Sequence, residues 1–329
     1  MIIKAGIIGG AGYTAGELIR ILLNHPNVEI SFVHSNSHVN KKLYTAHSDL
    51  LGETEIKFTN DLSQNVDVLF LCLGHGKAVE FLNSNIISEN TRIIDLSQDF
   101  RLNGNYTSPT GQIREFVYGL PELRRELIKK AHNIANPGCF ATAFELALLP
   151  LAASQELTSE IHINGITGST GAGQSLSDTT HFSWRNNNIS IYKAFTHQHL
   201  KEVRLTLETA AKNVIPALNF IPIRGNFSRG IFLSAYTHCT KSLEEITSLY
   251  RQFYKNAAFT FVSENEISVK DVVNTNKCFL TVERYDDKVL ITSVIDNLTK
   301  GASGQAVQNM NLMFGLDERC GLHLKPLSF

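Results

Sequence analysis

Apolar and polar positions in the first part of the chain follow two patterns, apolar runs of strand length and segments with one apolar helical face. The runs are continuous rather than alternating, which is typical of strands buried on both faces of a parallel sheet. The predicted strands are residues 2–8, 28–33, 66–73, 92–95 and 134–136. The predicted helices are residues 13–24, 78–82, 122–130 and 140–153, with a loop at 106–111 and a turn at 118–121. This alternation predicts an α/β domain with a Rossmann-type parallel sheet.

The pattern changes after Pro150, where longer segments alternate apolar and polar side chains or are rich in β-branched residues. The predicted strands there are residues 160–167, 220–224, 230–240, 267–273, 278–284 and 288–296. Helices are predicted at residues 200–211, 243–254 and 301–314. This half therefore predicts an α+β domain with a mixed or antiparallel sheet, and the last helix is predicted to return to the first domain. The expected domains are residues 1–138, completed by 301–329, and residues 139–300.

Composition narrows the class of protein. A chain of 329 residues can hold two cores, and 43% apolar with 19% charged residues is ordinary for a globular protein. The net charge of −1 and the short apolar runs argue against a nucleic-acid or a membrane partner. The five cysteines are scattered without a CxxC pair, and the first residues lack the pattern of a signal peptide. We therefore expect a cytoplasmic protein with no disulfide framework and no metal site.

A glycine-rich turn lies between the first predicted strand and the first predicted helix, and it fits the dinucleotide fingerprint as Gly10-x-Gly12-x-x-Ala15. Glycines there permit a tight turn and let a pyrophosphate approach the backbone N–H groups at the helix start. The predicted cofactor contacts in this turn are Gly9, Gly10, Ala11, Gly12, Tyr13 and Thr14. The alternative is a glycine-rich turn that binds nothing.

The residues after the second predicted strand indicate which dinucleotide binds. NAD-preferring sites usually carry an acidic residue there, whereas this chain has Ser35 and Asn36, with two lysines close behind. Hydroxyl, amide and ammonium groups accept a ribose 2′-phosphate that a carboxylate would repel, so the sequence favours NADP. The alternative is that the lysines are ordinary surface charges. Gly74 and His75 follow the predicted strand 66–73, where an open α/β sheet contacts its cofactor.

Cys139 is the candidate nucleophile, because it follows a Pro-Gly turn at the start of a predicted helix. Unpaired N–H groups and the helix dipole favour a thiolate there, and a small buried apolar cysteine is the alternative. His197 and His199 lie in a predicted extended segment, which would place both rings on one face. Proton transfer beside Cys139 is favoured over metal binding, because no third ligand stands out; a structural histidine is the alternative. Glu202 is expected to stabilise the start of the following helix.

Two further segments carry candidates for binding an anion. Arg101 follows the predicted strand 92–95 and could hold an anionic group bidentately, or it could brace a loop together with Asp99. The glycine-rich segment 168–175 is predicted to be a flexible loop that either cradles an anion through its N–H groups or only connects two elements. This segment lacks the Lys-Ser/Thr ending of a P-loop, which argues against a nucleotide triphosphatase.

Taken in order along nearly the whole chain, several segments resemble the N-acetyl-gamma-glutamyl-phosphate reductase family, arginine-biosynthesis enzymes related to aspartate-semialdehyde dehydrogenase. Each segment alone is a weak signal, but their shared order makes the likeness specific. The segments are residues 9–18, 95–102, 117–122, 136–139, 168–173, 197–199, 228–230 and 300–306. The chain departs from the family pattern at Ala15, at Phe140-Ala141 and at Gln198, where the family usually has arginine.

The resemblance implies that NADPH reduces an N-acyl-gamma-glutamyl phosphate to a semialdehyde, through a thioester on Cys139 with His197 or His199 moving the proton. Acetyl is the acyl group that the family implies, and the neutral Gln198 leaves succinyl open. The resemblance also implies a homodimer or homotetramer. The cofactor contacts that it adds are Gly171 and Gly173, and its substrate contacts are Arg101, Asn136, Ser169, Gln198, Glu202 and Arg229.

Three other functions remain open from the sequence. They are a reductase of aspartyl phosphate or glyceraldehyde 3-phosphate with the same architecture, a non-catalytic NADP-binding regulator, and a metal-dependent hydrolase built on the two histidines. The segments at 118–122 and 197–199 resemble the other reductases less. The regulator would not need a reactive Cys139, and the hydrolase would require a bound metal.

Overall fold

The computed structural model describes residues 2–62 and 65–327, and the chain divides into two compact units. The first unit comprises Met1–Pro137 and Ala302–His323, and the second comprises Gly138–Gly301 and Leu324–Phe329. The polypeptide therefore returns to the first unit near its end. No helix in the described residues has both the length and the apolar character that a membrane crossing requires.

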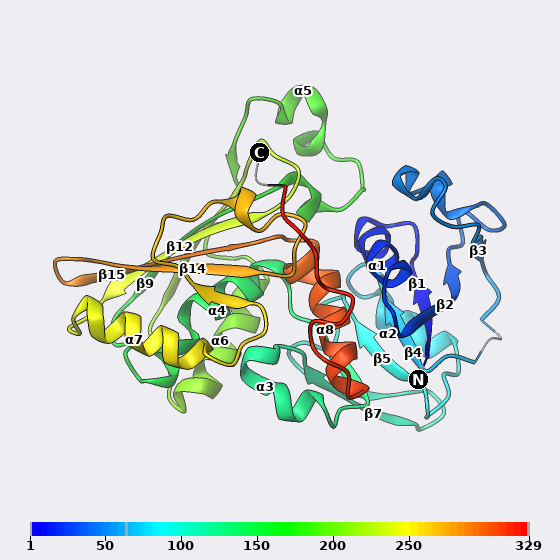
Figure 1. The fold of residues 1–329 in the computed structure, drawn as a ribbon, viewed down its shortest axis with the longest axis horizontal. Helices are drawn as coiled ribbons and strands as arrows, with labels where there is room; N and C mark the ends of the chain where they lie inside the picture. The colour runs from blue at the N-terminus through cyan, green and yellow to red at the C-terminus, as the bar shows by residue number, and fades with distance from the viewer. Residues whose placement is uncertain (1, 63–64, 328–329) are drawn as a thin grey trace. The chain divides into compact units, whose positions relative to one another are not determined.

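The first unit is built on an eight-stranded, mostly parallel sheet (Figure 1). Its strands are β1 (Ile3–Ile8), β2 (Val28–His34), β3 (Phe58–Thr59), β4 (Val68–Leu71), β5 (Arg92–Asp95), β6 (Asn105–Thr107), β7 (Ile113–Tyr118) and β8 (Asn133–Ala135). They lie in the order β3-β2-β1-β4-β5-β8-β7-β6, and only β6 is antiparallel to its neighbour. The direction of winding reverses beside β1, which is where such sheets bind ligands at their carboxyl ends. The predicted Rossmann-type domain is confirmed.

Helices in the first unit begin and end close to the predicted residues. They are α1 (Tyr13–Leu23), α2 (Lys77–Ser84), α3 (Pro121–Ile128) and α8 (Gly304–Met313). The apolar face of α1 is buried, as its spacing predicts. Helix α8 packs against α1 and α3, and all of its side chains are buried, including four amides. The last helix thus belongs to the first unit, as the sequence predicts.

The predicted loop and turn between residues 106 and 121 are wrong in part, because β6 and β7 form there. Charged residues interrupt the apolar pattern of β7, and Arg114 is the clearest case. Its guanidinium is buried and donates to the carbonyl oxygens of Ile87, Ser88 and Thr91 and to Oδ1 of Asn133. Tertiary hydrogen bonds therefore place a cation inside the sheet, which periodicity alone does not predict.

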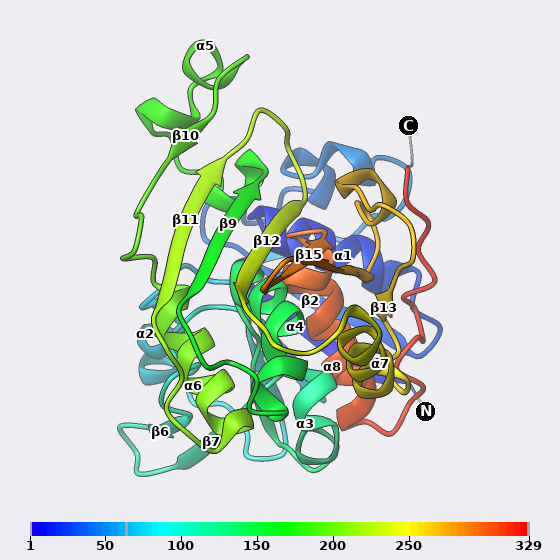
Figure 2. The ribbon, with the colours of Figure 1, turned by 90° about the vertical axis from the view of Figure 1, so that its left-hand side faces the viewer.

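The second unit is a seven-stranded mixed sheet (Figure 2). Its strands are β9 (Ile161–Thr167), β10 (Ser190–Ile191), β11 (Leu218–Arg224), β12 (Ile231–His238), β13 (Thr260–Val262), β14 (Cys278–Tyr285) and β15 (Lys288–Ile295). The order is β10-β11-β9-β12-β15-β14-β13, with parallel pairing only of β9 with β11 and of β13 with β14. The predicted mixed sheet is confirmed.

Four helices accompany this sheet: α4 (Cys139–Ala153), α5 (Phe182–Arg185), α6 (His199–Ala211) and α7 (Leu243–Tyr254). Helix α4 is buried along almost its whole length, and Tyr250 of α7 donates to its backbone at the Ala147 carbonyl over 2.5 Å. The predicted strand at 267–273 is wrong. Ser268 and Asp271 form a capping box that turns this β-branched segment into a short 3-10 helix, Val269–Asp271.

Candidate functional site

In the turn after β1, the backbone at Gly9 and at Gly10 lies so close to neighbouring residues that a larger side chain would clash. Gly9 has a φ of +80°, and a Cβ there would lie 2.5 Å from the carbonyl oxygen of Cys72. A Cβ at Gly10 would lie 2.2 Å from Cγ1 of Val33. Gly12 caps α1 with extended backbone and contributes no side-chain cap to the first N–H groups of the helix. The turn therefore fits the pyrophosphate of a dinucleotide, which needs close backbone approach and free N–H groups.

His47, which the sequence analysis did not select, fastens this turn. Its Nε2 lies 2.7 Å from the carbonyl oxygen of Gly10, and it must donate because a carbonyl can only accept. Its ring also fills the place of a side chain at Gly16, where a Cβ would lie 2.5 Å from Nδ1. The signal for this contact in the sequence is Gly16, a helical glycine that leaves room for a neighbour.

The residues that follow β2 are arranged as a turn. Ser35 is buried, with its Oγ 3.3 Å from Oγ of Ser37, and Asn36 is exposed. Lys42, one of the two lysines behind them, already has an anionic partner, because its Nζ lies 2.5 Å from Oε2 of Glu55. Ser35 and Asn36 therefore stay the predicted contacts for a ribose phosphate, whereas the charge of Lys42 is engaged elsewhere.

The loop after β4 leads directly into α2. Gly74 faces open space, and Nδ1 of His75 accepts a hydrogen bond from the N–H of Gln98 over 3.3 Å. The carboxylate of Asp99 accepts from three N–H groups at the start of α2, at 2.6, 3.1 and 3.2 Å. Asp99 is thus a helix cap, which stabilises the loop where the cofactor contacts are predicted.

Arg101 is buried against the ends of β5 and β8. Its Nε donates to the carbonyl oxygen of Asn136 over 2.9 Å, and its Nη2 donates to that of Leu96 over 3.0 Å. The Asn136 side chain donates to the carbonyl of Ala302 and accepts from Nδ2 of Asn309, each over 3.1 Å. These bonds fit the second of the two roles that the sequence left open for Arg101, which is to brace a loop. Contact of Arg101 or Asn136 with the substrate stays a prediction.

Cys139 is the first residue of α4, so the predicted nucleophile stands at a helix start. The helix cap is Gly138, in extended backbone, and its N–H donates to Oε1 of Glu202 over 2.8 Å. Glu202 lies in the first turn of α6 and is 4% exposed, so it joins the starts of two helices. Gly301 packs against the cysteine, because a Cβ there would lie 2.8 Å from Cβ of Cys139.

His197 and His199 meet at the start of α6 rather than on the face of an extended segment. The extended prediction is wrong because Phe195 has a φ of 57° and Gln198 has helical backbone, so the chain bends. The two ring centroids lie 4.8 Å apart, and the N–H of His199 donates to Nδ1 of His197 over 3.3 Å. Gln198 points its Oε1 to Nζ of Lys193, 3.1 Å away.

The surroundings of His197 favour its neutral form. It is 4% exposed, and the rings of Phe140 and Phe220 lie 5.6 Å from its centroid. Burial lowers the pKa of His197 to about 4, and the charges of Lys193 and Arg224 act in the same direction. His197 is therefore neutral at pH 7 and able to accept a proton.

Tyr192, Lys193 and Arg224 belong to this cluster, and none of the three was predicted from the sequence. The ring of Tyr192 lies 5.7 Å from that of His197, with the Arg224 guanidinium 4.6 Å from the Tyr192 centroid. Burial raises the pKa of Tyr192, a negative charge on Cys139 raises it further, and Arg224 opposes both. The signal for Arg224 was available: it is the one charged residue of β11 and stands at its end.

The glycine-rich segment 168–175, which the sequence predicts to be a loop, contains a short 3-10 helix, Ser169–Ala172. The N–H of Ser169 and of Thr170 donate to carbonyl oxygens of the 227–230 turn. The Thr170 hydroxyl adds a bond of 2.5 Å to the carbonyl of Ser228. Three predicted contact residues lie in this segment: Ser169, Gly171 and Gly173.

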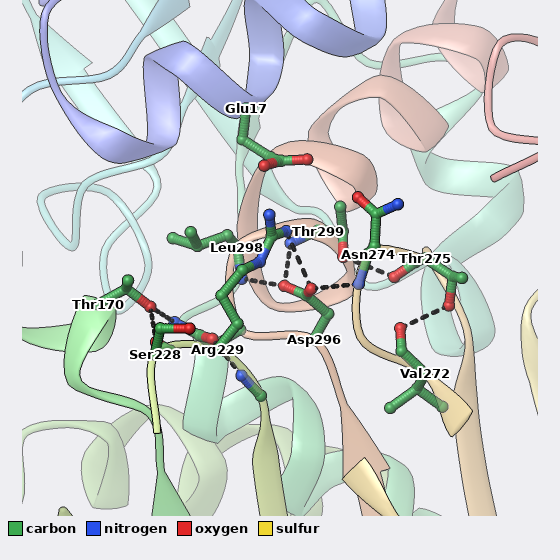
Figure 3. Close-up of polar contacts among 12 residues, drawn as sticks. Glu17, Thr170, Ser228, Arg229, Val272, Asn274, Thr275, Asp296, Leu298 and Thr299 are labelled. Carbon is green, nitrogen blue, oxygen red and sulfur yellow. Dashed lines mark hydrogen bonds and ion pairs between the residues drawn. The ribbon is translucent and has the colours of Figure 1, made fainter. Parts of the chain in front are cut away.

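Arg229 is half-buried and forms an ion pair with a buried aspartate (Figure 3). Its Nη2 lies 2.9 Å from Oδ2 of Asp296, whose side chain is fully buried. Asp296 also accepts from the N–H groups of Asn274, Leu298 and Thr299, at 2.6, 2.8 and 3.0 Å. This network holds the chain that leads from β15 to Gly301, and the predicted substrate contact of Arg229 would have to coexist with it.

These residues of the second unit provide the parts of an acyl-transfer site. They are a thiol at a helix start, the neutral imidazole of His197 with that of His199 beside it, and a group of cations. Among residues 2–62 and 65–327, no group of three or more His, Cys, Asp or Glu side chains is placed to hold a metal ion.

Two family models match the chain, one in each half. "Semialdehyde dehydrogenase, NAD binding domain" matches residues 4–131, and "Semialdehyde dehydrogenase, dimerisation domain" matches residues 139–297. Proteins named N-acetyl-gamma-glutamyl-phosphate reductase are similar over almost the full length. The one from Christiangramia forsetii is 58% identical, covering 98% of each chain, and the one from Flavobacterium johnsoniae is 57% identical, covering 99% of this chain and 100% of the relative.

Solved structures share the fold at low sequence identity. Aspartate semialdehyde dehydrogenase II from Vibrio cholerae, in complex with ASA, has a TM-score of 0.71 at 14% identity and covers 96% of this chain and 99% of that one. Aspartate semialdehyde dehydrogenase from Candida albicans, with NADP, has a TM-score of 0.69 at 12% identity, with 95% and 99% covered. These likenesses establish the two-domain dehydrogenase fold.

Proposed function

The chain belongs to the N-acetyl-gamma-glutamyl-phosphate reductase family of the semialdehyde dehydrogenases, and we propose that it reduces an N-acyl-gamma-glutamyl phosphate to the N-acyl-glutamate 5-semialdehyde with NADPH. The observation that carries the proposal is Cys139 as the first residue of α4, in the same unit as a neutral, buried His197. This pairing matches a cysteine nucleophile with a group that can move protons at neutral pH.

Cys139 performs the acyl transfer in this proposal. Its sulfur attacks the acyl-phosphate carbon, the bond from that carbon to the phosphate oxygen breaks, and phosphate leaves with the electron pair. A thioester remains on Cys139, and the N–H groups at the start of α4 are placed to stabilise the oxyanion that forms on the way. When bound, the nicotinamide cofactor supplies a hydride, and the thiohemiacetal on Cys139 then releases the aldehyde and regains the thiol.

His197 and His199 move the proton. One of the two imidazoles takes the proton of the Cys139 thiol and later returns one to the sulfur that leaves. His199 donates its backbone N–H to Nδ1 of His197, so neutral His197 carries its proton on Nε2 and is the proposed proton donor, with His199 as the proposed acceptor. Glu202 holds the Gly138 N–H and thereby fixes the turn before the nucleophile, a positioning role rather than direct substrate contact.

NADP is the proposed form of the cofactor. The glycine turn with His47 behind it would hold the pyrophosphate, and Ser35 and Asn36 would contact the ribose 2′-phosphate. The absence of an acidic residue directly after β2 supports this choice over NAD. Acetyl is the proposed acyl group, and the experiments below include a succinyl substrate as a comparison.

The second unit is proposed to form the contact between two copies of the chain. The match of residues 139–297 to a dimerisation domain supports this assignment. Light scattering on purified protein should give the mass of a dimer or of a tetramer at micromolar concentration. A monomeric mass would contradict it.

Replacing Cys139 tests the central step. Cys139→Ser should reduce turnover of N-acetyl-glutamate semialdehyde with NADP and phosphate by roughly a thousandfold or more, because a hydroxyl at neutral pH is a much weaker nucleophile than a thiolate. The affinity for NADPH, measured by fluorescence titration, should stay within about twofold of wild type. Cys320→Ser is the matched control, since Cys320 lies in the other unit, and it should retain full activity. A fully active Cys139→Ser protein would remove the cysteine from the mechanism.

A further inference from the structure

We propose that Arg224, assisted by Lys193, binds an anionic group of the substrate beside His197. This inference rests on the function proposed above and adds a binding residue to it. Neither cation was among the contacts expected from the sequence.

The backbone of Arg224 is fixed at the end of β11. Its carbonyl oxygen accepts from Nη1 of Arg185 over 2.8 Å, and Arg224 pairs with Ser190 of β10 and with Thr167 of β9. Arg185 is itself 6% exposed, and its guanidinium also bonds the carbonyl oxygens of Thr179 and Asn188. Arg224 therefore leaves a rigid strand end rather than a mobile loop, as a preorganised ligand contact requires.

The guanidinium of Arg224 points to the nucleophile cluster. It lies over the ring of Tyr192, with 4.6 Å between the guanidinium carbon and the ring centroid. Tyr192 in turn contacts His197, and its titration responds to the charge of Cys139. A substrate whose reacting carbon is bound at Cys139 would therefore have an anionic end within reach of Arg224.

The charge of Arg224 is not balanced within the protein. Its Nε is buried without a hydrogen-bond partner, and in the described part of the chain neither Arg224 nor Lys193 forms an ion pair. Nζ of Lys193 contacts only the neutral amide oxygen of Gln198 among the hydrogen bonds described. A second guanidinium, that of Arg185, adds to the positive field.

An anion bound here would accept a hydrogen bond from Nε of Arg224 and would balance the positive charge of its guanidinium. A buried N–H without a hydrogen-bond partner costs free energy. For a guanidinium, a hydrogen bond to a carboxylate or a phosphate removes this cost most effectively. The substrate of the proposed reaction carries a phosphate and at least one carboxylate, and a succinyl group would add another. The shared chemistry is an oxyanion, and the three sources can be separated by experiment.

Binding measurements test the site without turnover. Calorimetry on the full chain would use inorganic phosphate, N-acetylglutamate and N-succinylglutamate as probes, with Arg224→Gln, Arg224→Lys and the control Lys201→Gln, an exposed cation of α6. Arg224→Gln should weaken at least one probe by about tenfold or more, Arg224→Lys should weaken it less, and Lys201→Gln should not change it. Unchanged melting temperature and circular dichroism would show that the variants fold.

The pattern of loss identifies the source of the anion. Loss for phosphate alone assigns Arg224 to the leaving group, equal loss for both N-acylglutamates assigns it to a carboxylate they share, and loss for N-succinylglutamate alone assigns it to the acyl chain. KM values for phosphate and for N-acetyl and N-succinyl glutamate semialdehydes should rise in the same pattern, with kcat changed less. Wild-type binding of all three probes by folded Arg224→Gln, or no binding of any probe by wild type, would overturn the proposal. A protein that binds through Arg224 but turns over neither aldehyde would keep this site and refute the reductase.

Discussion

His197 illustrates how a residue's chemistry depends on its neighbours more than on its identity. A histidine beside a cysteine often forms an imidazolium–thiolate pair, but burial and two nearby cations oppose that charge here. The place of Cys139 at a helix start and of the glycine turn before α1 was predictable, because a Pro-Gly turn and a strand–glycine–helix order are local signals. Arg224, Tyr192 and His47 were not, because their partners are distant in sequence and only the folded chain brings them together.

The low pKa of His197 predicts that stability falls in mild acid. Unfolded histidine binds a proton below pH 6.5, whereas folded His197 stays neutral to about pH 4, so folding loses free energy as the pH falls between these values. From pH 7 to pH 5, this residue should lower the free energy of unfolding by about 2 kcal/mol. Urea titrations at both pH values measure the free energy of unfolding. The loss between pH 7 and pH 5 should be smaller in His197→Gln than in wild type, because the variant has no histidine to titrate at this position.

The exposed His132→Gln variant is the control for that experiment, and it should keep the pH dependence of wild type. If His197→Gln lost stability between pH 7 and 5 as steeply as wild type, the neutral state of His197 would be wrong.

The turn between β1 and α1 shows that an element can depend on a residue outside it. The strand, the turn and the helix were all predicted from the sequence, and the structure has them at nearly the same residues. The contact that fastens the turn comes from His47, which reaches the Gly10 carbonyl and packs where Gly16 has no side chain. The predictions that failed, in the loop at 106–111, the turn at 118–121, the extended segment at 195–199 and the strand at 267–273, failed because strand pairing, a backbone bend and a capping box overrode local periodicity.

Gly16→Ala should therefore weaken cofactor binding. The new Cβ would lie 2.5 Å from Nδ1 of His47 and push the ring away from the Gly10 carbonyl. We expect the Kd for NADPH to rise by about tenfold, the equivalent of one lost hydrogen bond, with kcat changed less. Fluorescence titration of NADPH measures it.

A double variant separates this contact from a general effect of alanine on α1. In a His47→Ala background the ring is absent, so Gly16→Ala should cost little further affinity. Independent, additive losses in the two single variants would argue against coupling through His47.

At the scale of the whole molecule, the two units follow from the change of hydrophobic pattern along the sequence. Continuous apolar runs separated by helices gave the parallel sheet, and alternating runs gave the mixed sheet. The return of α8 was expected, but its polar contacts were not. Asn309 donates to the Gly119 carbonyl, and Oδ1 of Asn311 accepts from Nε2 of His25, so α8 is bonded as well as packed.

Removing α8 should abolish cofactor binding while sparing the second unit. A chain ending at Gly301 lacks Ala302–His323, which exposes buried faces of α1 and α3, and it also lacks the short segment Leu324–Phe329 of the second unit, as the control below does. We expect no detectable NADPH binding, and limited proteolysis should digest residues 1–137 faster than 138–301. A chain ending at His323 keeps α8 and is the control, and it should bind NADPH like wild type. Normal affinity in the shorter chain would show that α8 is dispensable.

The discontinuity of the first unit also sets an order of events during translation. The segment that completes this unit begins at Ala302, so it leaves the ribosome only after residues 138–301. Residues 138–301 are all made before it, so the nascent second unit can fold while its predecessor still waits for α8. The first unit is thus completed only after the segment that holds Cys139 has been made, and a product terminated before Ala302 would carry the candidate nucleophile beside an unfinished first unit.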